Sequence, residues 1–285
     1  MSKNRFIKLS TFLATVFSAC FLSSCATKNY GDDIFRLQMA SHGKDVMWVP
    51  TKTQAVEQML ALAQLTPDDI LYDLGSGDGV IPIEAARRHR IKAFGIEYNP
   101  DLVALSIRNA DRAGVSQLVK FKTGDIFLED FSKASVVTLY LGEELNSKLK
   151  PKIQRLRSGT RIISNTFKMD SWIPDQQVRL DSGESIYLWI VPATIEGRWL
   201  LSLGQNSSSA TLQIRQRNQF FDGWIQTSDK QKFALAEGKI SGAYVSFAFK
   251  DSSNREQRFS GQVFGDELNG HLDSSLSAIG RRPLR

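Results

Sequence analysis

The sequence has few of the residues that carry metal, redox or nucleophilic chemistry. Its 285 residues include two cysteines and three histidines. Both cysteines, Cys20 and Cys25, lie near the N-terminus. A zinc site or thiol redox centre needs cysteine and histidine in clusters, and none is present. We therefore expect no metal site and no histidine-paired nucleophile. The histidines, which are widely separated, are His42, His89 and His271.

A strong excess of charge is also missing. Lysine and arginine number 36 against 30 aspartates and glutamates, which gives a net charge of +6. Half of that excess is Lys3, Arg5 and Lys8, in a stretch without acidic residues. The remainder is too small for the broad basic surface that nucleic-acid binding requires, so we expect no nucleic-acid partner. Glycine and proline are modest, at 20 and 8, which excludes a collagen-like chain.

An uncharged apolar run at residues 9–22 follows the basic start. It is shorter than the roughly 20 residues that a helix needs to span a bilayer, and it has the arrangement of a secretory signal peptide. Its end, Leu22-Ser23-Ser24-Cys25, resembles the bacterial lipobox, in which the cysteine becomes the lipidated first residue. The resemblance implies a signal peptide over 1–24, lipidation at Cys25 and a lipoprotein anchored in a membrane of the cell envelope. An uncleaved anchor is the alternative.

Two kinds of sequence pattern meet near residue 195. Before it, apolar runs alternate with segments of helical periodicity, which indicates parallel β–α–β units with helices on both faces. After it, short alternating strands are separated by glycine, asparagine, serine and aspartate, as in a small antiparallel barrel or sandwich. The aromatic residues Phe220, Phe221 and Trp224 are expected to fill its interior. The expected parts are a linker at 25–44, an α/β domain at 45–194 and an all-β domain at 195–285.

The α/β pattern predicts where its strands lie. Apolar runs of strand type are followed by glycine, asparagine or aspartate, which mark the turns. The last two strands have no helix between them and should form an antiparallel hairpin around residues 181–183. The expected strands are 69–74, 93–97, 119–122, 135–141, 160–166, 177–180 and 185–191.

The residues suited to ligand binding follow the first three of these strands. Gly75 and Gly77 lie in DLGSGDG, where glycines allow a tight turn and a close approach of ligand to backbone. The acidic-x-G-x-G-x-G spacing, which begins at Asp73, differs from the G-x-G-x-x-G of dinucleotide-binding proteins. Glu97 ends the second strand, where a ribose diol needs a carboxylate acceptor. Asp125 follows the third strand, so all these groups should face one crevice at the sheet edge.

In order and spacing, DLGSGDG, GIEYNP, KTGDIF and VVTLYL resemble the class I S-adenosylmethionine-dependent methyltransferases. That resemblance implies a seven-stranded Rossmann-like sheet that ends in an antiparallel hairpin. WVPT at 48–51 and SGTRIISNTF at 158–167 are similar to a narrower group, which includes archaeal and mitochondrial protein-lysine methyltransferases. It implies an enzyme of class 2.1.1 with S-adenosyl-L-methionine as cofactor and a protein lysine as acceptor.

The resemblance also assigns roles to residues at matching positions. The methionine end of the cofactor would be held by the glycine loop, and its carboxylate would be covered by a threonine of WVPT. The ribose would be bound by the acid that ends the second strand, with the adenine beside the next residue and its amino group on a later aspartate. In that order, these residues are Asp73, Gly75, Gly77, Thr51, Glu97, Tyr98 and Asp125.

On the acceptor side, the resemblance is weaker. The candidates for a direct catalytic role are Tyr140, at the end of the fourth strand, and Glu143, just past it. Glu143 could instead be an acidic residue favoured by the start of a helix. The chain has Ser164-Asn165-Thr166-Phe167 where relatives read SH-x-F, and 141–144 read LGEE instead of LLPE. The family resemblance is therefore the weakest guide to the identity of the methyl acceptor.

Export and catalysis make conflicting demands. S-adenosylmethionine is made in the cytoplasm, whereas a lipidated, exported protein faces away from it. Some cofactor could reach the envelope by an unknown route, or translation could start at Met39 or Met47 and give a cytoplasmic enzyme. In a further alternative, an envelope lipoprotein uses the methyltransferase fold and the β-domain for binding or scaffolding, without catalysis.

Overall fold

The computed structural model describes residues 47–204, 208–273 and 275–283. The expected signal peptide, the lipidation site Cys25, the linker to residue 44 and Met39 lie outside the described residues. In the part of the chain that is described, no helix is both long and apolar enough to span a bilayer.

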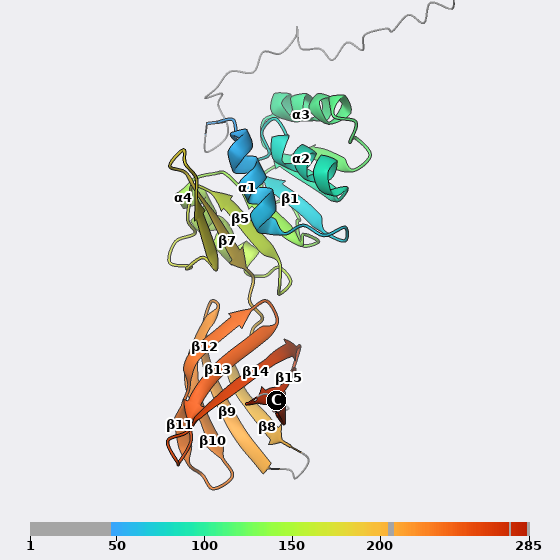
Figure 1. Cartoon of the computed structure of the whole chain (residues 1–285). Helices are drawn as coiled ribbons and strands as arrows, with labels where there is room; N and C mark the ends of the chain where they lie inside the picture. Colours follow the sequence, from blue (N-terminus) through green and yellow to red (C-terminus); the bar gives the residue numbers. More distant parts are fainter. Residues whose placement is uncertain (1–46, 205–207, 274, 284–285) are drawn as a thin grey trace, which may run out of the picture. The chain divides into compact units, whose positions relative to one another are not determined.

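A seven-stranded sheet forms the first part of the fold, in the order β3-β2-β1-β4-β5-β7-β6 (Figure 1). The strands from β1 to β5 pair in parallel, and β7 runs antiparallel to both β5 and β6. This confirms the expected sheet with its terminal hairpin. The strands are β1 (Ile70–Leu74), β2 (Lys92–Glu97), β3 (Val119–Thr123), β4 (Val136–Leu139), β5 (Arg161–Asn165), β6 (Gln176–Arg179) and β7 (Ser185–Ile190).

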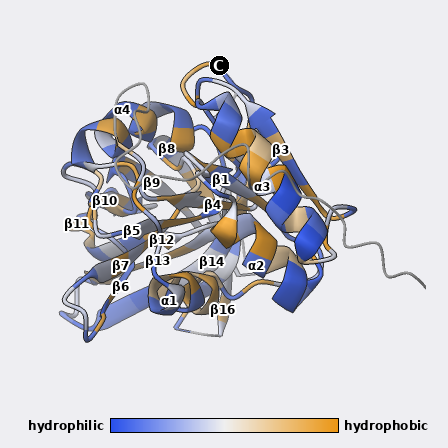
Figure 2. Cartoon of the chain, turned by 90° about the horizontal axis from the view of Figure 1, so that it is seen from above, coloured by the Kyte–Doolittle hydropathy of each residue, from blue (hydrophilic) through white to orange (hydrophobic). Residues whose placement is uncertain are grey.

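Helices cover both faces of this sheet. One apolar cluster joins α1, α2 and α3 to the strands, and a second cluster joins α4 to residues on the opposite face. Hydrophilic and hydrophobic residues lie on different sides of α2 and α3 (Figure 2), as expected of helices that pack on a sheet. The helices are α1 (Thr53–Ala63), α2 (Val80–His89), α3 (Pro100–Arg112) and α4 (Glu143–Ile153).

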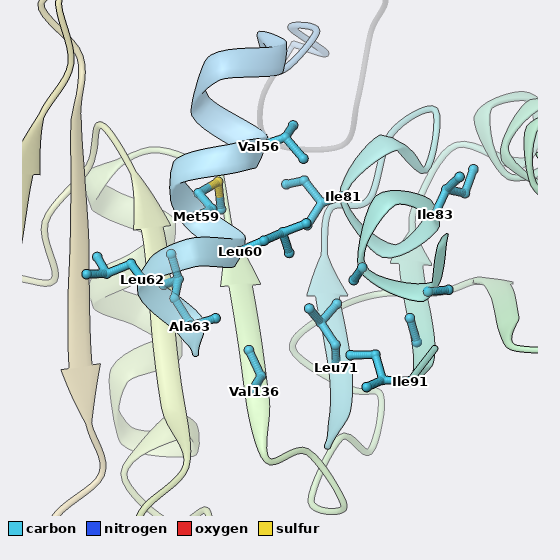
Figure 3. Packing of buried hydrophobic residues seen from close by; sticks show 14 of the residues in the cluster. Val56, Met59, Leu60, Leu62, Ala63, Leu71, Ile81, Ile83, Ile91 and Val136 are labelled. Atoms are coloured by element: carbon cyan, nitrogen blue, oxygen red, sulfur yellow. The ribbon is translucent and has the colours of Figure 1, made fainter. Parts of the chain in front are cut away.

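Helix α1 shows how the sequence pattern produces this packing. Val56, Met59 and Leu60 recur at helical spacing, and each is at most 2% exposed. Val56 and Leu60 lie beside Ile81 of α2 (Figure 3), and all three belong to one apolar cluster with Leu71 of β1. Burying each large apolar side chain contributes about 1.5–3 kcal/mol. These contacts fix the chain directly after the WVPT segment against the sheet.

The fourth strand is shorter than the sequence pattern suggests. β4 ends at Leu139, the last residue paired with β1 and β5. The backbone then turns through Gly142, whose φ is 114°, before α4 begins at Glu143. Tyr140 therefore lies on the loop beyond the strand end, at the edge of the sheet where ligands bind in open α/β folds.

The remaining strands form a nine-stranded antiparallel sheet, and pairing of β9 with β10 closes it into a barrel. The sequence left a barrel and a sandwich open, and the structure is a barrel. Strand β7 ends before residue 191 and β8 begins at Gly197, so the chain changes sheets in between. The strands are β8 (Gly197–Leu203), β9 (Ser208–Arg217), β10 (Phe220–Thr227), β11 (Lys232–Ala234), β12 (Ala236–Ser241), β13 (Tyr244–Lys250), β14 (Glu256–Phe264), β15 (Glu267–Leu272) and β16 (Leu276–Arg281).

The barrel interior differs from expectation at two aromatic residues. Phe221 packs in the apolar cluster as predicted. Phe220 is 41% exposed, and Trp224 lies under the Lys232 ammonium at 4.3 Å from its ring centroid. The prediction was wrong for these two because strand side chains alternate between faces, and Phe221 and Ile225 occupy the inner one.

Candidate functional site

The loop after β1 favours glycine at two positions that face the cavity. Gly75 and Gly77 have φ of 77° and 54°, in the left-handed region that side chains disfavour. A Cβ at Gly75 would collide with the Leu141 side chain, and one at Gly77 would collide with the Trp48 indole. The loop therefore brings bare backbone to the cavity and leads into the N-terminus of α2, where N–H groups attract an anion.

Glu97 ties this loop to the end of β2. Its Oε2 accepts a hydrogen bond from the Gly77 N–H at 3.0 Å, and its Oε1 accepts one from the Asn99 N–H at 2.8 Å. The side chain is held in one orientation, and the residue is only 8% exposed. Since a carboxylate oxygen can accept more than one hydrogen bond, both oxygens remain able to receive hydroxyl groups of a ligand.

Asp73 lies below the loop, at the end of β1. Burial raises the pKa of its carboxyl to about 7, against a 2.7 Å hydrogen bond from Thr138 Oγ1, and the negative charges of Glu97 and Asp78 add to the rise. The group is therefore divided between its acid and ionised forms near neutral pH. A cation placed next to it would favour the ionised form.

The other end of the cavity is formed after β2 and β3. Tyr98 is 51% exposed there, beside Leu102, Asp125 and Ile126. The Phe127 N–H donates to Asp125 Oδ1 at 2.9 Å, which fixes that carboxylate in the turn. A flat aromatic ring, an apolar floor and a carboxylate acceptor suit a purine base with an exocyclic amine.

One cavity brings together every residue that the sequence assigned to the cofactor. Its empty volume is about 880 Å³ when the open solvent at its mouth is included. The assigned residues that line it are Thr51, Asp73, Gly75, Gly77, Glu97, Tyr98 and Asp125.

The two catalytic candidates lie in different surroundings. Tyr140 lines the cavity, and its ring stacks on Phe167 with centroids 5.9 Å apart. Burial and the negative charge of Glu184 raise the pKa of the Tyr140 hydroxyl, so the phenol is neutral at physiological pH. Glu143 is exposed in the first turn of α4 and does not line the cavity. A role for Glu143 stays a prediction that this geometry does not support.

Sequence reasoning gave no role to several residues around the cavity. Met47, Trp48 and Val49 line it together with Thr51, although Thr51 alone in this segment was assigned a place at the cofactor. Their position just before Thr51 in the sequence is the signal that could have identified them as cavity residues. Phe167 lies in the SNTF segment that departs from the relatives, and only its contact with Tyr140 places it near the site.

Comparisons with known proteins agree with this site. Residues 73–176 match the family described as the ANTKMT methyltransferase domain. A protein-lysine N-methyltransferase of Saccharolobus islandicus is 36% identical over 156 residues, which are 53% of this chain and 97% of that protein. The adenine nucleotide translocase lysine N-methyltransferase of Mus musculus is 33% identical over 130 residues, which are 45% of this chain and 56% of that protein.

A solved structure extends the comparison to three dimensions. The RNA methyltransferase of Salinibacter ruber, in complex with S-adenosyl-L-homocysteine, is 48% identical with a TM-score of 0.50. The match covers 52% of this chain and 96% of that one. Together with the glycine loop and the seven-stranded sheet, these similarities show that the chain belongs to the ANTKMT-type family of class I S-adenosylmethionine-dependent methyltransferases.

Proposed function

We propose that the protein transfers a methyl group from S-adenosylmethionine to the side-chain amine of a protein lysine. The observation that carries this proposal is the single cavity in which the glycine loop, Glu97 and Asp125 meet Tyr140 at one edge of the sheet. The relatives named as lysine N-methyltransferases support lysine as the acceptor. They also favour this reading over a lipoprotein without catalysis.

The residues fit the cofactor along its whole length. Asp73 and the N–H groups after Gly75 and Gly77 would receive the charged groups of the methionine end, under Thr51. Glu97 would accept from the ribose hydroxyls, while Tyr98 and Asp125 would hold the adenine. When bound, the cofactor supplies a methyl group on a sulfonium, which is already a good leaving group.

The protein's task on the acceptor side is alignment and desolvation. A lysine must lose its proton before its amine can attack, and an apolar surrounding lowers the pKa of an ammonium. Tyr140 and Phe167 provide two aromatic rings on that side. They would exclude water and direct the amine toward the methyl group. Such alignment of the reactants is the main contribution to rate enhancement in a reaction that needs little acid–base chemistry.

Calorimetric titration tests the cofactor site first. S-adenosylmethionine and S-adenosylhomocysteine should bind with micromolar affinity, whereas NAD should give no heat. Glu97→Ala should weaken binding by about 100-fold or more, since it removes a charged acceptor and frees the loop. Circular dichroism would show that the variant is folded. A folded wild-type protein that binds neither compound would contradict the proposal.

RNA is a second candidate acceptor, because the 48% identical protein of Salinibacter ruber is named an RNA methyltransferase. The mild net charge of this chain argues against it. Incubation of the protein and a tritiated methyl donor with cell extract separates the two. Label that protease removes and ribonuclease leaves supports the lysine proposal; the reverse result would assign RNA.

We also propose that the chain is exported and anchored in the cell envelope through Cys25. The apolar run and the lipobox resemblance support this. Palmitate should label the wild-type protein and not Cys25→Ser. An unlabelled wild-type protein found in the cytoplasm would favour a start at Met39 or Met47 instead.

A further inference from the structure

An ion pair lies next to the acceptor side of the cavity. Lys52 Nζ is 3.0 Å from Glu184 Oε1. Lys52 directly follows Thr51, which lines the cavity, and Glu184 lies in the turn between β6 and β7. The two side chains differ in exposure: that of Lys52 is 62% exposed and that of Glu184 only 19%. The carboxylate is thus the more fixed partner, and the ammonium is at the surface.

Backbone contacts place Glu184 close to the aromatic residues of the acceptor side. The Thr166 N–H donates to the Ser185 carbonyl at 2.7 Å, so the end of β5 adjoins the turn that carries Glu184. Phe167, the next residue along, stacks on Tyr140. The charges of both Glu184 and Lys52 act on the pKa of the Tyr140 hydroxyl, in opposite directions, which agrees with this placement.

The chemistry of Glu184 suits an incoming lysine. Lys52 and the Ser182 hydroxyl, which is 3.0 Å from Oε2, hold the pKa of Glu184 below its ordinary value despite partial burial. The group is therefore a carboxylate at neutral pH, and its partner is a lysine ammonium. An acceptor lysine presents the same ammonium, so exchanging one for the other conserves the charge pair.

We propose that Glu184 binds the ammonium of the acceptor lysine as it enters, and that Lys52 occupies this carboxylate until the acceptor displaces it. The inference rests on the proposed lysine methyltransferase function and adds an acceptor-binding residue to it. Displacement is inexpensive, because an ion pair with one partner this exposed contributes little net stability. Lys52 then acts as an internal competitor of the substrate.

This arrangement predicts effects of opposite sign for the two partners. The experiment measures steady-state methylation of a peptide with a single lysine among glycine, alanine and serine residues. Glu184→Gln should raise KM for the peptide about 10-fold or more, the effect of losing one charge-assisted hydrogen bond. Lys52→Met should lower KM several-fold, since the carboxylate is left free for the substrate. The affinity for S-adenosylhomocysteine should change in neither variant.

A purely structural ion pair gives a different result. Loss of either partner would then change KM or stability in the same direction. Asp222→Asn is a matched control, because Asp222 pairs with Arg215 at 2.7 Å on an exposed part of the barrel and should leave KM unchanged. Calorimetric binding of the peptide to the protein saturated with S-adenosylhomocysteine provides a second readout, in which the two variants should again shift in opposite directions.

The outcomes separate this inference from the proposed function. A wild-type protein that binds no cofactor, or binds it and methylates neither the peptide nor polylysine, overturns the function and the inference together. A wild-type protein that methylates the peptide, with Glu184→Gln and Lys52→Met shifting KM in the same direction or not at all, overturns the inference alone. Opposite shifts support it.

Discussion

Asp73 shows how much one buried carboxyl can determine. Its pKa near 7 results mainly from burial next to two other acids. Between about pH 4 and pH 7, the folded protein therefore holds a proton there that the unfolded chain, with a pKa near 3.8, has lost. The carboxyl lies below the loop that would receive the methionine end of the cofactor. Its protonation therefore affects both the stability of the fold and the electrostatics of the site.

The first prediction concerns the pH dependence of folding. Because the folded pKa is raised, the contribution of Asp73 to stability is fully present below about pH 4. It is lost as the pH rises through 7, with a slope of up to about 1.4 kcal/mol per pH unit. Asp73→Asn should remove this slope. The measurement is urea denaturation of both proteins between pH 4 and 8. If the free energies of unfolding of the two proteins depend on pH in the same way, the pKa of Asp73 is not raised in the folded state.

The second prediction concerns cofactor binding at the same residue. If the ammonium of the methionine end lies near Asp73, binding at pH 7 should favour the ionised carboxyl and release a fraction of a proton. Calorimetry with S-adenosylhomocysteine in buffers of different ionisation enthalpy measures this release. Asp73→Asn should abolish it. An enthalpy that is the same in every buffer would place the ammonium elsewhere.

At the scale of elements, the glycine loop and the WVPT segment depend on each other. The Trp48 indole packs on the backbone of Gly77, so the strap of residues 47–51 and the loop after β1 form two walls of one cavity. Neither wall belongs to a helix or strand, and both are held by neighbouring elements. The loop is held by hydrogen bonds from the Gly75 and Ser76 N–H groups to the Ile96 carbonyl, at 2.8 and 3.1 Å, together with the contact to Trp48.

The third prediction separates that contact from backbone strain. Gly77→Ala should weaken binding of S-adenosylhomocysteine at least 10-fold, because the new Cβ displaces Trp48. Gly114→Ala is the control: its φ of 69° is similarly unfavourable, by about 1 kcal/mol, but nothing lies within 4 Å of its Cβ. Both variants should lose stability in thermal denaturation, and only the first should lose affinity. Equal affinities would mean that Trp48 does not shape the site.

The fourth prediction concerns how β1, β5 and α1 are joined. Arg161 donates to the carbonyls of Ala63 at 2.7 Å and Gln64 at 2.9 Å and pairs with the buried Asp69. Arg161→Met leaves this carboxylate without its cation and should cost about 3 kcal/mol in chemical denaturation. Arg88→Met, which breaks more exposed pairs, should cost under about 1 kcal/mol. Equal losses would contradict the role given to Arg161.

At the scale of the whole molecule, the α/β sheet could be predicted from sequence, and so could the gathering of the seven assigned residues around one cavity. Strands buried on both faces appear as apolar runs, and Glu97 stands where one of them, β2, stops. Alternation along β10 already implies that Phe220 and Phe221 face opposite sides, but which of them faces inward could not be predicted, because the strand's partners set its inner face. Lys52 and Glu184 could not be paired either, since only the folded chain brings such distant positions together.

The fifth prediction concerns the proposed division at residues 194 and 195. The apolar clusters of the α/β sheet end at Val191, and that of the barrel begins with Ala193 and Ile195. Because every residue that lines the cavity precedes residue 146, a fragment of residues 45–194 should fold and bind S-adenosylhomocysteine within about 10-fold of the full chain. If circular dichroism shows that the fragment is unfolded, the barrel is part of the same folding unit.

The hydrogen bond from the Gly77 N–H to Glu97 has a consequence for how the cavity fills. The carboxylate assigned to the ribose also holds the loop assigned to the methionine end. A ligand in one half would act on the other through this shared residue, so we expect binding in the two halves to be coupled. Adenosine and methionine, offered as separate molecules, would bind cooperatively, each strengthening the other by the same factor. We therefore expect the cavity to hold the whole cofactor more tightly than a metabolite that shares only half of it.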